Sequence, residues 1–203
     1  PVPQIRFSTT LFGVERRPDV AVRLKVADIG ISGTGSGDGC QDPKTGEVFY
    51  KDIMLTANAS GTYSGKPLTT YPYNNLLFAV SRDGWIALPG NTPGKAYSIG
   101  VKGPKHRNVR MIETVTLANK TPASQDFNWI SKPLEPGDVP DPNNGWKQDC
   151  TINSIDLSLV ESRIGKTDAE SNKVADINYE NVVNGSDVSK IVNTLKKNPD
   201  DDL

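Results

Sequence analysis

The residues with the clearest capacity for chemistry lie near the C-terminus, in the twelve-residue segment D-I-N-Y-E-N-V-V-N-G-S-D at 176–187. Calcium is a hard cation that takes roughly six to eight oxygen ligands, and a loop of about this length presents them from positions 1, 3, 5, 7, 9 and 12. In this segment those positions are Asp176, Asn178, Glu180, the carbonyl group of Val182, Asn184 and Asp187. Every position carries an oxygen, so the spacing predicts one bound calcium ion, Ca2+.

Two further positions of this segment fit the same loop. Position 6, where glycine is usual, is Asn181, and asparagine is the non-glycine residue that best tolerates a left-handed backbone. Position 8 is Val183, an apolar residue that we expect to point into a small core. A simpler interpretation is an ordinary polar turn in which Asp187 caps a helix. The complete set of ligand positions favours calcium.

The end of this loop and the start of the helix after it occur twice in the chain. Residues 152–160, I-N-S-I-D-L-S-L-V, align with residues 183–191, V-N-G-S-D-V-S-K-I, at an offset of 31 residues. The identical pairs are Asn153 with Asn184, Asp156 with Asp187, and Ser158 with Ser189. Apolar positions match as well, so we expect two copies of one loop–helix unit.

With both copies considered, residues 138–196 resemble a type I dockerin, a module of paired calcium loop–helix units that docks noncovalently into a cohesin. The resemblance is most specific in V-V-N-G-S-D-V-S-K-I at 182–191 and covers a little under a third of the chain. It implies a cohesin-like partner. Cohesins recognise loop positions 10 and 11, which are Ser154 and Ile155 in one copy and Gly185 and Ser186 in the other. The symmetric hydroxyl pairs of cellulosomal dockerins are therefore absent.

The first copy departs from the dockerin pattern. Counted back from position 12, positions 3 and 1 fall on Lys147 and Gly145, which have no side-chain oxygen. One account is an enlarged loop whose first ligand comes from the preceding segment. The ligands of that loop would be Asp138, Asp149, Thr151, Asn153 and Asp156. The other account is that the Lys147 ammonium takes the place of the ion. Both accounts remain open, so the chain is expected to bind one calcium ion or two.

The larger part of the chain has the pattern of β-structure. From residue 4 to about residue 117, apolar and polar residues alternate between turns rich in Gly and Pro, which is typical of half-buried strands. The expected strands are Gln4–Phe12, Asp19–Asp28, Val48–Ala57, Leu76–Val80, Ala96–Val101 and Val109–Leu117. This pattern predicts an antiparallel β-sandwich over residues 1–131. Through L-P-G-N-T-P-G-K-A-Y-S-I-G-V-K-G-P at 88–104, it also resembles bacterial extracellular Ig-like and carbohydrate-binding-like sandwiches.

The composition changes at residues 132–145, which contain four of the fifteen prolines. Because proline excludes regular helix and central strand, we interpret this segment as the interdomain linker and the start of the first loop. Beyond it the apolar residues have helical spacing, at Leu157, Val160 and Ile164 and then at Val188, Ile191, Val192 and Leu195. Gly165 is expected to end the first helix. We therefore expect a small all-α, dockerin-like domain with an acidic tail at 146–203.

Composition and charge exclude several functions. The net charge is −1 without a basic run, so nucleic acid is not an expected partner, and no apolar run approaches the roughly 20 residues of a transmembrane segment. The single histidine, His106, lies in a polar turn and is expected to be exposed, without a nucleophile motif around it. No phosphate loop or zinc spacing occurs. We expect no catalysis.

The two cysteines, Cys40 and Cys150, both lie in polar, loop-like segments. In a secreted protein they would form a disulfide between the two expected domains, and two free thiols are the alternative. Taken with the calcium loop, this pairing predicts a secreted or cell-surface protein.

Two functions fit these features. The first is a non-catalytic structural protein that associates with copies of itself or with a cohesin-like protein and polymerises into an extracellular filament. Its N-terminal strand either adds to a neighbour's sheet or pairs within its own domain. The second is a carbohydrate-binding, cellulosome-like component. In that case Tyr71, Tyr73 and Trp85 offer flat faces for a sugar ring of a polysaccharide, and burial of Trp85 in the core is the alternative.

Overall fold

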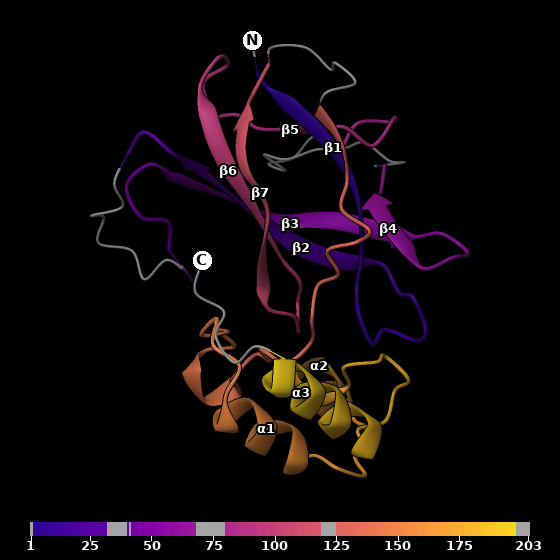
Figure 1. Cartoon of the computed structure of the whole chain (residues 1–203). Helices are drawn as coiled ribbons and strands as arrows, with labels where there is room; N and C mark the ends of the chain where they lie inside the picture. The colour runs from indigo at the N-terminus through magenta and orange to yellow at the C-terminus, as the bar shows by residue number, and fades with distance from the viewer. Residues whose placement is uncertain (1, 32–39, 41, 68–79, 119–124, 198–203) are drawn as a thin grey trace.

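The computed structural model describes residues 2–31, 40, 42–67, 80–118 and 125–197. Within them the chain is mainly β, with the strands at one end and three short helices at the other (Figure 1). The strands are β1 (Gln4–Thr10), β2 (Val20–Asp28), β3 (Glu47–Ala57), β4 (Thr62–Gly65), β5 (Ile86–Ala87), β6 (Ala96–Lys102), β7 (Asn108–Thr116) and β8 (Asp126–Asn128). The helices are α1 (Ser154–Glu161), α2 (Ala169–Ala175) and α3 (Gly185–Lys197), preceded by the 3-10 turn η2 (Pro142–Asn144).

The strands form one curled sheet in which every strand is hydrogen-bonded to a neighbour. Its order is β5-β1-β4-β3-β2-β6-β7, and β8 pairs with β1. All pairs are antiparallel except β1 with β8, which is parallel. The prediction of a mainly β, largely antiparallel part is confirmed. The two separate sheets of a sandwich are replaced by one continuous sheet that curls around its own core (Figure 1).

The alternation in the sequence determines which side of the sheet is buried. In β2, Val20, Val22, Leu24 and Val26 are buried and the residues between them are partly exposed. This is the period of two that a strand with one wet face requires. Each fully buried side chain of this size stabilises the fold by about 1.5–3 kcal/mol. The core also contains Trp129, which stacks on Phe7 and Phe127.

The long strands lie close to their expected positions, and the short ones were not expected. The strands β4, β5 and β8 contain only four, two and three residues, so an alternating pattern cannot be recognised in them. Of the strand expected at Leu76–Val80, only Val80 lies within the described residues, and it forms a bridge with Ile86. The N-terminal strand pairs within its own sheet, since Ser8–Thr10 faces Thr62–Ser64 of β4. It is not a free strand for a neighbour's sheet.

The helices surround a second, smaller hydrophobic cluster. Its buried residues are Val139, Ile152, Val160, Val174, Ala175, Ile177, Val183 and Ile191. The helix α2 was not expected; it is seven residues long, and Asp168 caps it by accepting a hydrogen bond from the Ser171 N–H. Ile164 lies outside α1 and is exposed, in contrast to its expected place on the buried face. Gly165 has a φ of 84°, as a residue that stops a helix requires.

The expected linker joins the two parts but is not a free spacer. Leu134 is fully buried, and its backbone exchanges hydrogen bonds with β1 and the residues after it, from Leu134 N to Thr10 O and from Phe12 N to Leu134 O. Further along, Gly137 N donates to Lys105 O at 2.9 Å. The prolines prevent an α-helix here, and the only helical turn in this fully described segment is η2, but residues between the prolines still use their N–H groups. The segment therefore fixes the helices against the sheet.

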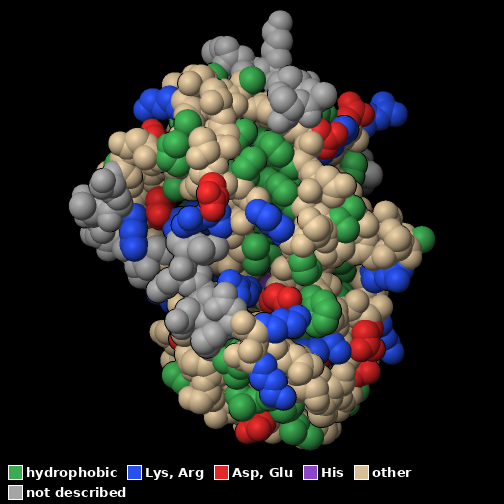
Figure 2. All heavy atoms as spheres, viewed as in Figure 1, with side chains coloured by type: hydrophobic (Ala, Val, Ile, Leu, Met, Phe, Trp, Pro, Cys, Tyr) green, Lys and Arg blue, Asp and Glu red, His purple; other side chains and the backbone are tan. Residues whose placement is uncertain are grey.

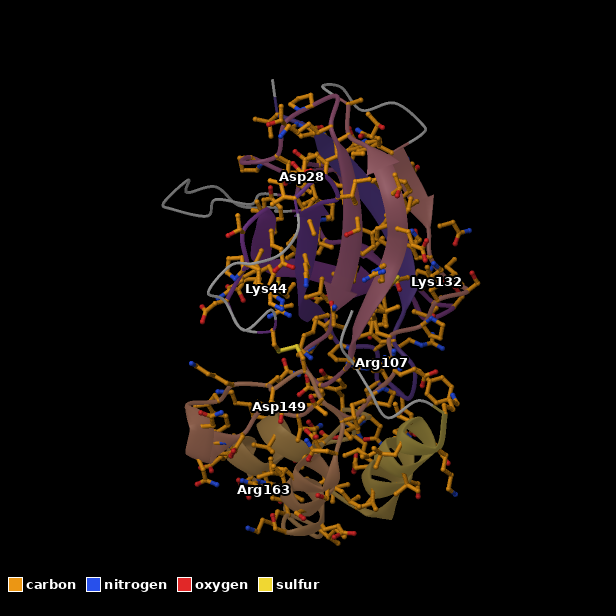
Figure 3. All side chains as sticks on the ribbon, turned by 60° about the vertical axis from the view of Figure 1, so that its left-hand side comes forward. Asp28, Lys44, Arg107, Lys132, Asp149 and Arg163 are labelled. Carbon is orange, nitrogen blue, oxygen red and sulfur yellow. A yellow bond between two sulfur atoms is a disulfide. The ribbon has the colours of Figure 1, made fainter. Side chains whose placement is uncertain are left out.

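The disulfide between Cys40 and Cys150 is present, with a Cα–Cα distance of 5.7 Å, which confirms the predicted pairing. In Figure 3 its yellow bond lies between the sheet and the helical part, near Lys44 on one side and Asp149 on the other. None of the helices in the described ranges is long and apolar enough to cross a membrane.

Candidate calcium loops and their contacts with the sheet

The loop at 176–187, here called the second loop, connects α2 with α3 and folds around its first carboxylate. Asp176 is 2% exposed; its Oδ1 accepts a hydrogen bond from Glu180 N at 2.9 Å and its Oδ2 accepts one from Asn181 N at 2.8 Å. Asn181 has a φ of 68°, the left-handed backbone expected at position 6. The chain therefore turns back on itself at the point where the calcium loop requires a sharp turn.

The last predicted ligand of the second loop, Asp187, is fully buried at the start of α3. Its Oδ1 accepts from Ile177 N at 2.7 Å and its Oδ2 accepts from Asn184 N at 2.9 Å. Burial raises the pKa of the Asp187 carboxyl, and the negative charge of Asp176 raises it further. Two buried carboxyl groups thus lie near one another at the two ends of one loop, an arrangement that a cation would stabilise.

The second loop also brings its other predicted ligands together. Asn184 Nδ2 donates to Glu180 Oε1, and Asn178 Oδ1 accepts from Glu180 N at 3.2 Å. Asn178 is fully buried, and its Nδ2 has no hydrogen-bond partner. Three carboxylates, two amides and the Val182 carbonyl form an all-oxygen donor set, which fits calcium rather than zinc. Within the described ranges, however, no three His, Cys, Asp or Glu side chains form a metal-binding cluster. The carboxylates of Asp176 and Asp187 bind backbone N–H groups instead, and that of Glu180 accepts a hydrogen bond from the Asn184 side chain.

The first loop, residues 138–156, repeats the framework of the second. Asp156 Oδ1 accepts from Val139 N and Asp156 Oδ2 accepts from Asn153 N, both at 2.9 Å. These bonds correspond to those of Asp187 with Ile177 and Asn184. The structure therefore places Asp138 where the second loop has Asp176. Cys150, 31 residues before Asn181, shares its left-handed backbone with a φ of 65°.

The first loop differs from the second in what meets its first carboxylate. Asp138 is fully buried and forms an ion pair with the Lys102 ammonium at the end of β6, which is 3% exposed. Lys102 also donates to the carbonyl of His106 at 2.8 Å. Burial raises the pKa of Asp138, and the Lys102 ammonium opposes that rise. Lys147, the lysine proposed from the sequence, is exposed. The lysine beside the buried carboxylate of the first loop is therefore Lys102 and not Lys147.

The remaining ligand candidates of the first loop have other roles. Asp149 is exposed, and its Oδ1 accepts from Thr151 N at 2.9 Å. Asn153 caps α1 by accepting from Ile155 N at 2.6 Å. Asp156 is buried, and desolvation raises the pKa of its carboxyl to about 7. Only two carboxylates of this loop, those of Asp138 and Asp156, are therefore buried within it.

A second lysine near the end of β6, Lys105, contacts the second loop and the helix before it. Lys105, between β6 and β7, donates to the carbonyls of Asn172, at 2.7 Å, and Asp176, and its Nζ lies 4.3 Å from the centroid of the Tyr179 ring. Burial lowers the pKa of the Lys105 ammonium to about 8. One turn of the sheet thus sends Lys102 to the first loop and Lys105 to the second.

His106, between these two lysines, was expected to be exposed, and this expectation was wrong. The residue is fully buried because segment 134–138 covers the turn, and His106 forms a bridge with Pro136. Burial lowers the pKa of its imidazole to about 3, and the charges of Lys102 and Lys105 contribute. The sequence K-G-P-K-H-R has the composition of a surface turn, so it contains no signal for the buried roles of these three residues.

The surfaces at the two recognition positions also differ. In the first copy Ser154 and Ile155 are exposed, Ile155 by 57%. In the second copy Ser186 accepts a hydrogen bond from Lys190, which also pairs with Glu15 of the β1–β2 connection. That connection therefore covers part of α3 and leaves α1 open. On the face drawn in Figure 2, positive and negative side chains are interspersed, without an extended field of one sign.

The residues proposed to stack on a sugar are not brought together as a site. Tyr71 and Tyr73 lie outside the described residues. Trp85 is half-buried, and the guanidinium of Arg6 lies over its ring at 4.9 Å from the centroid. A nearby hollow of about 500 Å³ is bordered by residues such as Arg6, Thr56, Arg82 and Asp126, and none of the described residues that line it is aromatic.

Comparisons with known proteins add little to this geometry. No family model matches the chain, and no curated protein matches it. A solved structure with some similarity is an N-terminal interface mutant of a type II cohesin–X-dockerin complex from Acetivibrio cellulolyticus. One chain of it has a TM-score of 0.42 and 10% identity, over 93% of this chain and 94% of that chain. A TM-score of this size establishes neither a shared fold nor a shared partner.

Proposed function

We propose that this chain is a secreted, non-catalytic assembly protein whose helical part is a dockerin-like module with one calcium ion in the second loop. The observation that carries the proposal is the pair of buried carboxyl groups, Asp176 and Asp187, at the ends of a loop that folds back around them. Two such groups repel each other unless a cation or protons neutralise them. The ligand spacing of the loop supports calcium as that cation.

The ion would be held by the residues that the spacing identifies. Its ligands would be Asp176, Asn178, Glu180, the Val182 carbonyl, Asn184 and Asp187. Calcium supplies a double positive charge that neutralises the carboxylates when it is bound. The loop joins α2 to α3, so fixing it stabilises the small helical core around Ile177 and Val183. Metal binding is coupled to folding in a module of this size.

A protein partner is the second part of the proposal. The exposed Ile155 on α1 lies at a recognition position of the first copy. In the second copy Ser186 is hydrogen-bonded to Lys190, which also pairs with Glu15 of the β1–β2 connection. We place the contact with a cohesin-like partner or a second copy of the chain on α1. The Cys40–Cys150 disulfide supports secretion, since such bonds persist in oxidising compartments. Polymerisation would use this surface, because β1 is already paired.

Calcium titration followed by thermal unfolding tests the metal. The melting temperature should rise with calcium and fall with a chelator, and the Asp187→Asn variant should show neither change. An unchanged wild-type melting temperature after chelation would refute the calcium site.

Size-exclusion chromatography with light scattering, and negative-stain imaging, test assembly in calcium and in chelator. Calcium-dependent oligomers, or a complex with a cohesin, support it, and Ile155→Lys should weaken them. A chain that stays monomeric, binds no cohesin and binds polysaccharide contradicts it. That alternative has less support, because Arg6 covers a face of Trp85.

A further inference from the structure

The two loops have the same framework and different positive charges beside it. In both, the last aspartate accepts backbone hydrogen bonds from the residue after the first aspartate and from the asparagine at position 9. In the first loop, the Lys102 ammonium contacts the first aspartate, Asp138. In the second loop, Lys105 donates to the backbone carbonyl of the first aspartate, Asp176. The Asp176 carboxylate accepts hydrogen bonds from the backbone N–H groups of Glu180 and Asn181.

We infer that the Lys102 ammonium takes in the first loop the place that calcium takes in the second, so that the chain binds one calcium ion. The inference rests on the proposed function for the second loop. For the first loop it rests on the buried ion pair alone, because Lys102 and Asp138 are 3% and 0% exposed.

A metal does not fit the first loop as the structure has it. A cation at the carboxylate of Asp138 would meet the Lys102 ammonium, and like charges repel strongly where water is excluded. Both loops bury two aspartates, but they differ at position 5. Glu180 of the second loop is half-buried and accepts a hydrogen bond from the Asn184 side chain, whereas Asp149 of the first loop is exposed and accepts one from Thr151 N. Lys147 is exposed, so the ammonium beside the Asp138 carboxylate is that of Lys102.

Unlike a bound metal ion, the Lys102 ammonium is covalently attached to the sheet. Lys102 belongs to β6, so its ion pair connects the first loop directly to the sheet, and it also donates to the carbonyl of His106. Removing one partner of a buried pair leaves the other charge uncompensated, whereas replacing both with neutral groups is often tolerated. The first loop and α1 therefore keep their structure without calcium, and only the second loop depends on it.

The test combines calcium stoichiometry with a double-mutant cycle. Native mass spectrometry of the full chain with calcium should show one bound ion, which Asp187→Asn removes and Asp138→Asn retains. Two ions, one of them lost in Asp138→Asn, would overturn the inference while leaving the proposed function intact. No bound ion would contradict the proposed function, and the cycle below, measured without calcium, would still decide the ion pair.

The cycle uses urea unfolding in chelator. Lys102→Met and Asp138→Asn should each lower the unfolding midpoint, and the double variant should unfold at a higher urea concentration than either single variant. Lys147→Met is the matched control and should unfold like the wild type. A Lys102→Met midpoint equal to that of the wild type would overturn the inference.

Two further measurements complete the test. If a single variant does not fold, the double variant, which contains neither charge, provides the comparison with the wild type, and its failure to fold as well would overturn the inference. An intact mass lower by one water in the denatured, reduced wild-type chain, and unchanged from the calculated mass in Lys102→Met, would show that the Lys102 amine and the Asp138 carboxyl had condensed to an amide. That result would also overturn the ion pair, whereas the unmodified mass supports it.

Discussion

The two loops of the helical part share one backbone framework and differ in the positive charge that lies beside it. Each buries an aspartate at its start and another at its end, Asp138 with Asp156 and Asp176 with Asp187. The first loop has a lysine of the sheet beside it, and we propose a calcium ion for the second. The difference arises from what packs nearby, because the loop sequences alone do not contain Lys102.

The comparison also separates the two loops by what they require. The first is fixed by a disulfide at Cys150, by the Lys102 ion pair and by the hydrogen bond of Gly137 to Lys105. The second is fixed to the sheet by Lys105 and by the hydrogen bond of Glu15 N to Asn178 O at 3.1 Å. Loss of covalent or buried ionic contacts should therefore affect the first loop, and loss of calcium should affect the second.

The largest effect should come from removing the disulfide. The double variant Cys40→Ser with Cys150→Ser should lose about 4–5 kcal/mol in free energy of unfolding, because a closed loop of about 100 residues restricts the unfolded chain by that amount. Urea unfolding with and without reductant measures it, since reduced wild type should match the variant. The calcium affinity of the folded variant should stay within about twofold of wild type. A large fall would show that the two loops are not independent.

The second largest effect should distinguish Asp187 from Asp156, the buried aspartates that end the two loops. Asp187→Ala should lower the free energy of unfolding by about 4 kcal/mol in saturating calcium and by about 2 kcal/mol in chelator, because it removes both hydrogen bonds and ion binding. Asp156→Ala, its counterpart in the first loop, should cost about 2 kcal/mol in both conditions. Urea unfolding of the two variants in both buffers is the measurement. Equal calcium dependence of the two would contradict the assignment.

A smaller effect is expected for Lys105→Met. The ammonium donates to two backbone carbonyls, and hydrogen bonds from charged groups contribute about 1.5–3 kcal/mol. We expect a loss of about 2 kcal/mol and faster hydrogen exchange in α2 and the second loop, with the first loop unchanged. The exposed Lys166 provides the matched control, and Lys166→Met should be silent. Faster exchange in the first loop instead would refute the division between the two lysines.

The smallest effect depends on pH and on His106. Its folded-state pKa of about 3 lies below the usual value near 6.5, so the unfolded chain takes up a proton first as the pH falls. Its contribution to stability is therefore complete above about pH 6.5 and declines toward pH 3, by up to about 2 kcal/mol at pH 5. Relative to pH 7.5, His106→Leu should lose less stability than wild type at pH 5 when both are unfolded in urea with chelator.

Comparison with the variant is needed because the Asp156 carboxyl contributes a pH dependence of stability opposite in sign to that of His106. Its raised folded-state pKa, about 7, makes stability fall as the pH rises from about 4 toward 7. The difference between the wild-type and His106→Leu profiles cancels this contribution. Identical profiles would contradict a buried, neutral imidazole.

Some of this structure could be predicted from local sequence and some could not. The alternation in Val20–Val26 is a property of one segment, and it correctly predicted β2. The short strands β5 and β8 exist because β1 lies beside them, and two or three residues contain no period of their own. The linker prolines correctly excluded a regular helix but gave no sign that Leu134 would be buried.

The candidate site shows the same limit. The repeat and the ligand spacing lie within 31 residues of one another, so the sequence identified the framework and placed the altered loop in the first copy. The positive charge beside the first loop comes from Lys102, which lies 36 residues before Asp138. The segment around Lys102 has the composition of an exposed turn. Only packing brings these residues together, and packing also buries His106.

A crystal structure grown with calcium tests the central claim most directly, because anomalous scattering locates each ion. The account predicts one ion in the second loop, bound by residues that include Asp176 and Asp187, and no ion beside Asp138, where the Lys102 ammonium should lie. An ion at Asp138, or a second loop that stays without metal in saturating calcium, would contradict it.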